Sequence, residues 1–201
     1  MRRKSPFVIV IVFMSVLSFV FTASAGTEVE QWTNAADLAL SRNDYAAAVK
    51  WYSKAAERGY ALAQYNLGAM YGIGMGVQRN DVEAFKWFRK AAEKEFASAQ
   101  YNLGVMYREG NGVQQNYVEA MKWFRRAAEQ GHAGAQNNVG VSYGKGLGVP
   151  QNFVLAYMWC SLGATEGDSV STKNRDLFAS WLTPAQLAEA QKLAAEWRPK
   201  K

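Results

Sequence analysis

The clearest pattern along the chain is an apolar stripe at helical spacing. After Asn80, apolar residues fall at positions i, i+3, i+4 and i+7: Ala84, Trp87, Phe88 and Ala91. The charged residues between them fall largely on the opposite face, and this 3.6-residue period predicts an amphipathic α-helix. Asn80, with Glu83 three residues later, predicts a capping box at the start of that helix.

Another helix is predicted upstream, roughly from Ala61 to Tyr71. Gly68 lies within it, and because glycine has no side chain, a neighbouring helix can approach closely at that point. The glycine-rich segment 72–76 then predicts a turn with positive φ angles. Two helices joined by this turn form one structural unit.

The unit repeats with a period of 36 residues. Residues 60–95, 96–131 and 132–167 align without a gap; the first two copies are identical at 24 of 36 positions, and the second and third at 17. One helix pair cannot bury its own apolar stripe, so stacked copies must share a core. The expected fold is all-α, a right-handed α-α solenoid. Its core is expected to contain the tryptophan column Trp51, Trp87, Trp123 and Trp159.

Atypical units are expected at both ends of the array. Residues 26–59 lack the glycine turn, and their apolar positions match the spacing of a tetratricopeptide-like unit: Trp32, Ala36, Tyr45, Ala48, Tyr52 and Ala55. Residues 168–201 are expected to form a C-terminal capping helix pair. Its second helix should start at Thr183 as N-cap, with Pro184 at N1 and Gln186 at N3. Residues 198–201 are expected to fray.

The first 25 residues have the pattern of a secretory signal peptide. Residues 2–4 are basic, residues 7–21 are largely apolar, and residues 23–25 read Ala-Ser-Ala, which suits signal peptidase. An uncleaved membrane anchor is the alternative, but the apolar run is short for a spanning helix. We therefore expect a periplasmic or secreted protein with no stable membrane insertion after cleavage.

Charge and cysteine content narrow the function classes. The formal net charge is +6, and cleavage after Ala25 would leave 20 basic and 17 acidic residues, a net charge of +3. This mixed balance gives no reason to expect nucleic-acid binding. Cys160 is the only cysteine, so an internal disulfide is excluded and stability must come from packing. No metal or cofactor is expected.

The repeat resembles the Sel1-like repeat, a relative of the tetratricopeptide repeat. The residues that carry the resemblance are Gln64-Tyr65-Asn66-Leu67-Gly68-Ala69-Met70-Tyr71, Gly74-x-Gly76-Val77 and Ala84-x-x-Trp87-Phe88-x-x-Ala91-Ala92. The second copy matches as well, and the third departs at Asn137, Ser142 and Cys160. The resemblance covers roughly residues 32–197 and implies an adaptor, regulator or assembly scaffold. A β-lactam-binding branch carries paired cysteines in each repeat, which this chain lacks.

Three residues are of types found in catalytic sites, but each is expected to have a structural role. Ser142 fits G-x-S-x-G and S-x-x-K, but a nucleophile elbow needs a strand-to-helix turn, and Ser142 lies within a predicted repeat helix. His132, the only histidine, opens the third copy without obvious partners. Cys160 occupies an apolar column and is expected to be a buried thiol, a reactive or intermolecular cysteine being the alternative.

The resemblance points to the concave face, formed by the first helix of each unit, as the binding surface. The candidate partner-binding residues are Tyr65, Ala69, Ser98, Tyr101, Val105, Arg108, Asn137 and Lys145. Tyrosines flanked by Arg108 and Lys145 would suit a peptide with an acidic end. The alternative is that Tyr65 and Tyr101 only pack between repeats.

The expected function is that of an exported protein–protein interaction scaffold or regulator, not an enzyme. Its partner would be a protein or peptide of the cell envelope, and the oligomeric state is not set by the sequence. One alternative is a weak cell-wall or β-lactam-directed hydrolase, for which no cluster of catalytic groups is evident. Another is a peptidoglycan- or polysaccharide-binding module, for which few aromatic residues remain outside the repeating columns.

Overall fold

The computed structural model describes residues 28–165 and 168–200, and within these ranges the chain forms helices and no strand. The expected signal peptide lies outside the described residues. A helix over 28–41 is followed by α2 Tyr45–Glu57, α3 Ala61–Ile73, α4 Asp81–Glu93, α5 Ala97–Glu109, α6 Tyr117–Glu129, α7 Ala133–Lys145, α8 Phe153–Gly163, α9 Ser169–Ala179 and α10 Pro184–Glu196. None of the helices described is long and apolar enough to cross a membrane.

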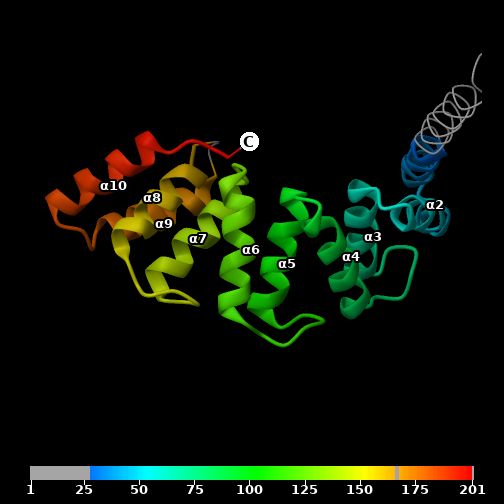
Figure 1. Ribbon diagram of the computed structural model, residues 1–201, viewed down its shortest axis with the longest axis horizontal. Helices are drawn as coiled ribbons and strands as arrows, with labels where there is room; N and C mark the ends of the chain where they lie inside the picture. The colour runs from blue at the N-terminus through cyan, green and yellow to red at the C-terminus, as the bar shows by residue number, and fades with distance from the viewer. Residues whose placement is uncertain (1–27, 166–167, 201) are drawn as a thin grey trace, which may run out of the picture.

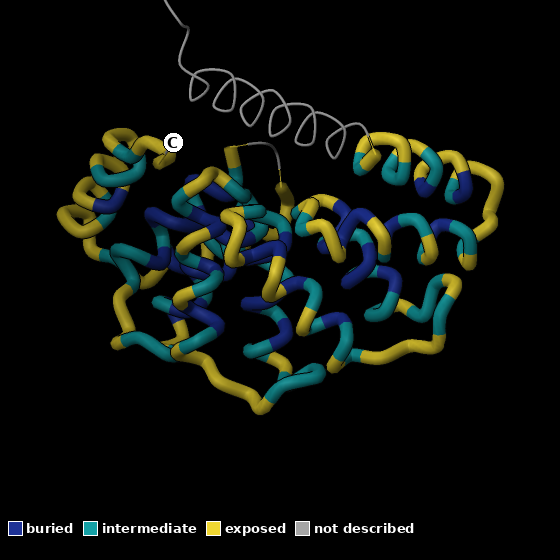
Figure 2. The backbone as a smooth tube through the Cα atoms, turned by 45° about the vertical axis from the view of Figure 1, so that its right-hand side comes forward, coloured by how far each residue is buried: buried dark blue, intermediate teal, exposed yellow. Residues whose placement is uncertain are grey.

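The helices stack in chain order as an elongated array of pairs (Figure 1). Each 36-residue unit supplies an A helix (α3, α5 or α7) that packs against the following B helix (α4, α6 or α8), and each B helix contacts the next A helix. Buried residues lie on the sides of the helices that face their neighbours, whereas the connecting loops are largely exposed (Figure 2). The expected all-α solenoid is confirmed.

The turn between the paired helices begins two residues later than expected. Gly72 is still helical, α3 ends at Ile73, and the positive φ angles fall at Gly74 (75°) and Gly76 (73°). A Cβ atom added to Gly76 would lie 2.4 Å from the carbonyl oxygen of Tyr45, so this turn packs directly against the preceding helix α2. Only glycine allows both this φ and this approach.

The helix starts agree only in part with the sequence prediction. The Asn80 side chain accepts hydrogen bonds from the backbone N–H groups of Val82 and Glu83, both at 3.1 Å. The Glu83 carboxylate, however, pairs with Lys86 at 2.6 Å instead of reaching back to Asn80. Asn80 is therefore a simple N-cap, and the predicted capping box is wrong here. At α10 the predicted box of Thr183 and Gln186 is confirmed.

The buried aromatic column lies one residue after the tryptophans. Phe88 and Phe124 are 6% and 1% exposed, and a Cβ atom added to Gly104 would lie 2.6 Å from the Phe124 ring. Trp51, Trp87 and Trp123 are only half-buried at the edge of the core, while Trp159 is buried. These three rings pack against the core without being enclosed in it, so the predicted core role is confirmed only in part for them. Their helix face turns toward solvent, where cationic side chains cover the rings: Lys54, Lys90 and Arg126.

The C-terminal segment closes the array. Helix α10 packs on α8, with Trp197 and Trp159 ring centroids 6.1 Å apart. The chain then runs back to the end of α6, where the Lys200 backbone N–H donates to the Glu129 carbonyl at 2.7 Å (Figure 1). The expectation of a frayed tail is therefore wrong for residues 198–200, because Lys200 also pairs with the Glu129 carboxylate at 2.7 Å.

Candidate binding groove on the A-helix face

The surface formed by α3, α5 and α7, here called the A-helix face, contains a hollow between α3 and α5. Its volume is about 260 Å³. The walls and floor come from α3, α4, α5 and the loops beside them: Ala69, Gly72, Ile73, Arg79, Asp81, Ala84, Phe88, Asn102, Val105, Met106 and Asn111. Two of the candidate residues from the sequence, Ala69 and Val105, are therefore brought together here on neighbouring units.

The two candidate tyrosines pack between repeats. Tyr65 is half-buried, with its ring centroid 5.7 Å from Phe88 and 5.2 Å from Phe96. Tyr101 is likewise half-buried and stacks on His132 at 4.7 Å. Each tyrosine thus fixes the start of the next unit, which is the structural alternative considered above. Their remaining exposed edges still border the A-helix face.

The polar candidates are divided between internal contacts and solvent. Arg108 donates to the Asn138 side chain at 2.6 Å, so this guanidinium is not free for a ligand. Asn137 accepts a hydrogen bond from Asn174 at 2.8 Å and is half-buried beside α9. Ser98 is half-buried at the start of α5. Lys145 is exposed and forms no ion pair with the described residues.

The opposite surface, formed by α4 and α6, also has hollows, but its charges are already matched. A hollow of about 630 Å³ beside the C-terminus is lined by Arg126, Glu95, Glu129 and Lys200. Arg126 pairs with Glu95 at 2.9 Å, and Lys200 pairs with Glu129. Smaller hollows beside Trp87 and Trp123 contain tryptophan rings covered by cations, such as Lys90 at 4.0 Å from the Trp87 centroid. Sugar stacking needs an open aromatic face, so these rings are poorly placed for glycan.

The residues that invited a catalytic interpretation have structural surroundings. Ser142 is buried within α7, not on a strand-to-helix elbow. His132 is the N-cap of α7: its Nδ1 accepts from the Ala135 N–H at 3.2 Å, and burial lowers its pKa. Cys160 is fully buried beside Asn137, and burial raises the pKa of its thiol to about 12, which disfavours the reactive thiolate. Among the described residues no cluster of potential metal ligands occurs.

Sequence reasoning missed the residues that shape the hollow, chiefly Gly72, Phe88 and Asn102. The sequence does contain a signal for them. Position 72 is glycine, whereas the equivalent position one unit later is Arg108 and two units later is Gly144. A change from no side chain to a long cationic one, within otherwise similar repeats, marks the place where successive grooves differ.

Comparison with known proteins agrees with this architecture. The chain is similar to a solved protective antigen present in uropathogenic Escherichia coli strains, which displays an SLR fold (41% identity, TM-score 0.69). It is also similar to a Sel1 repeat protein from Oxalobacter formigenes (38% identity, TM-score 0.64). The matches cover 74% and 76% of this chain, but only 32% and 65% of those chains.

No curated protein matches the chain. The model of the Sel1 repeat, in contrast, matches four consecutive stretches: residues 38–60, 61–96, 97–132 and 133–168. Together these stretches span most of the described solenoid, including each of the A and B helices. The chain belongs to the Sel1 repeat family.

Proposed function

We propose that this protein is an exported scaffold that binds a partner protein or peptide of the cell envelope through its concave A-helix face. Sel1 repeats generally mediate protein–protein interaction. The observation that carries the proposal is the hollow between α3 and α5, which combines apolar walls from Ala69 and Val105 with polar groups from Asp81 and Asn102. Such a mixture of apolar surface and a few placed polar groups is typical of binding sites.

The leader pattern of residues 1–25 supports export. Single-cysteine composition is compatible with an oxidising compartment, because Cys160 is buried and cannot readily pair with another chain. The stacked units supply a continuous surface that an extended ligand can follow over several repeats.

Site-specific photo-cross-linking in envelope extract tests this proposal. A photoreactive residue at Ile73, which is 67% exposed and lines the hollow, should cross-link to a defined partner. The matched control is Lys122, an exposed residue of α6 on the opposite surface. Cross-linking from Lys122 but not from Ile73 would show that the partner binds the other face. Failure of both variants to capture a protein, with retention on peptidoglycan, would favour the glycan-binding alternative.

A further inference from the structure

Three successive grooves on the A-helix face are filled in different ways. Their central position is occupied by Gly72 in α3, Arg108 in α5 and Gly144 in α7, each 36 residues apart. Between α7 and α9 the Phe178 ring lies against Gly144, where an added Cβ atom would be 2.2 Å from a ring carbon. Between α5 and α7 the groove holds the Arg108 side chain. Between α3 and α5 the central residue is Gly72, and the groove contains the hollow.

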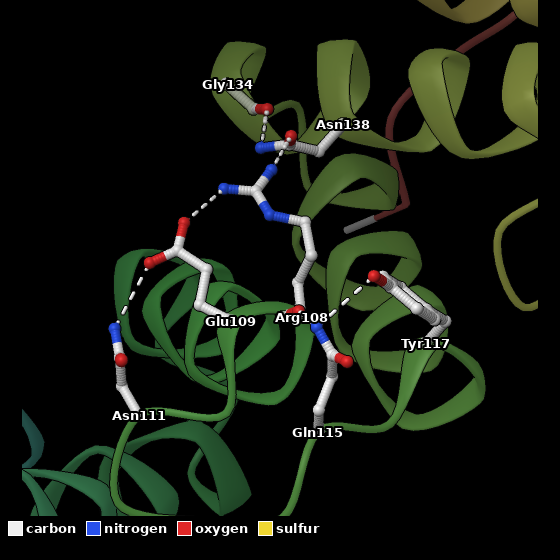
Figure 3. A network of polar contacts seen from close by, with 7 residues as sticks. All are labelled: Arg108, Glu109, Asn111, Gln115, Tyr117, Gly134 and Asn138. Atoms are coloured by element: carbon white, nitrogen blue, oxygen red, sulfur yellow. Dashed lines mark hydrogen bonds and ion pairs between the residues drawn. The ribbon is translucent and has the colours of Figure 1, made fainter.

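The Arg108 guanidinium shows what this groove accommodates (Figure 3). Its carbon lies 5.7 Å from the centroid of Phe124, which forms the floor. One nitrogen donates to the Asn138 side-chain oxygen at 2.6 Å, and another donates to the Glu109 carboxylate at 2.8 Å. Asn138 is held in turn by donating to the Gly134 carbonyl at 3.0 Å. The groove is thus a guanidinium socket of one aromatic floor, one amide and one carboxylate.

The α3/α5 hollow has similar parts, but glycine, Gly72, stands at the position of Arg108. Phe88 stands 36 residues before Phe124 and lines the hollow, and Asn102 stands 36 residues before Asn138. Asn138 receives Arg108, whereas the Asn102 side chain makes no hydrogen bond with the described residues. The amide of Asn102 is therefore available to a ligand at the position where its counterpart binds a guanidinium.

The carboxylate is also present, at a shifted position. Ile73 replaces Glu109 at the rim and offers apolar surface to an aliphatic stem. Asp81 takes the place of Tyr117, and its side chain is 30% exposed. Arg79 already pairs with Asp81 through two hydrogen bonds, from Nε to Oδ1 at 3.1 Å and from Nη2 to Oδ2 at 3.0 Å, but Arg79 is 64% exposed, so solvent screens this pair. A carboxylate has about four lone-pair sites, which leaves capacity for a second cation.

From this internal template we propose that the α3/α5 hollow receives an arginine side chain of the partner. The inference rests on the proposed function, because it requires a ligand on the A-helix face. A guanidinium fits better than an ammonium, since its planar fork can stack on Phe88 while it donates to Asn102 and Asp81. An acidic side chain is disfavoured because Asp81 would repel it.

The test uses N-acetyl-arginine methylamide as the probe and follows the protein by heteronuclear NMR. Adding the probe should shift the Asn102 side-chain amide and the Val105 methyl groups in a saturable manner. N-acetyl-citrulline methylamide has the same shape without the charge and should bind at least about fivefold more weakly. Equal shifts with both probes, or no shift at Asn102, would overturn the proposal.

The Gly72→Arg variant provides the matched control. A Cβ atom at position 72 would lie 3.7 Å from the Ala84 Cβ, an ordinary contact, so the fold should be retained and a thermal melt will verify it. The new arginine should fill the hollow from within, as Arg108 does, and abolish the Asn102 response. A variant that is folded and still binds the probe would contradict the proposal. Absence of a probe response in the wild-type protein, with intact cross-linking from Ile73, would overturn this inference and leave the proposed function standing alone.

Discussion

The α3/α5 and α5/α7 grooves are built from two copies of one sequence unit, yet only the first contains an open hollow. Both have a phenylalanine floor, Phe88 or Phe124, and an asparagine wall. They differ at position 72, where the first copy has glycine and the second has Arg108. In the second groove the chain supplies its own ligand, and in the first it leaves the equivalent place unfilled.

This difference separates two kinds of position in a repeat protein. Positions shared by both grooves, such as the phenylalanine and the small glycine packed against it, hold neighbouring helices together. Positions that differ decide what each groove contains. Internal repetition therefore indicates the fold, and departures from it indicate where recognition takes place.

The largest effect is expected from removing the floor of the filled groove. Phe124→Ala should lower the free energy of unfolding by about 3–5 kcal/mol, because a large buried ring is lost from the core. Phe88→Ala should lower the free energy of unfolding by about 0.5–1 kcal/mol less than Phe124→Ala does, because only the Phe124 ring also contacts the Arg108 guanidinium. Denaturant titrations of both variants measure the two values. Equal losses of unfolding free energy in the two variants would show that the contact between Arg108 and the Phe124 ring adds no stability.

A second comparison concerns two glycines that occupy the same repeat position. Gly144→Ala should destabilise by about 1–3 kcal/mol, because the added methyl group would overlap the Phe178 ring. Gly72→Ala should instead stabilise by about 0.5–1 kcal/mol, because alanine favours the helix and the neighbouring Ala84 leaves room. Thermal melts of the pair give the sign directly. Destabilisation by Gly72→Ala would mean that the α3/α5 groove is not open.

The smallest effect concerns pH and the residue on which each groove tyrosine packs. Tyr65 packs on Phe96, whereas Tyr101 stacks on His132, whose pKa is lowered by burial. A lowered folded-state pKa means that the unfolded chain binds the proton more readily. The contribution of neutral His132 to stability is therefore complete above the pKa of about 6.5 that histidine has in the unfolded chain. It is lost as the pH falls from that value through the lower pKa of the folded state.

The variant His132→Phe should remove this dependence, because phenylalanine already serves at the equivalent position 96. As the pH falls from 8 to 5, the melting temperature of the wild type should fall more than that of the variant. An unchanged difference across that interval would show that His132 has the same pKa in the folded and unfolded states.

Most of the fold could be predicted from the sequence because the same short pattern occurs three times. Helix period and the Thr183 cap are local features and were found where expected, and the glycine turn was found two residues later than expected. The predicted core role held only in part for Trp87, which packs against the core but is half-buried, because a helical stripe does not say whether its edge faces a neighbour or solvent. It also failed for Lys200, whose contact with Glu129 joins residues 71 positions apart.

The candidate site could be predicted only as a face. The sequence predicts the A-helix surface, and the predicted residues Ala69 and Val105 line its hollow. The role of Arg108 was not foreseen, because the sequence does not show that its side chain reaches Asn138 thirty residues away. Long-range contacts of this kind decide which cationic side chains remain available to a ligand. These contacts are set by the packing of whole units.

The most direct test of this account exchanges the two central residues in one double variant, Gly72→Arg with Arg108→Gly. The exchange should close the α3/α5 groove and open the α5/α7 groove, with little net change in helix propensity, since one glycine is lost and one is gained. On titration with N-acetyl-arginine methylamide, the NMR response should move from the side-chain amide of Asn102 to that of Asn138. A response that stays at Asn102, or that appears at neither asparagine in the folded variant, would contradict the account.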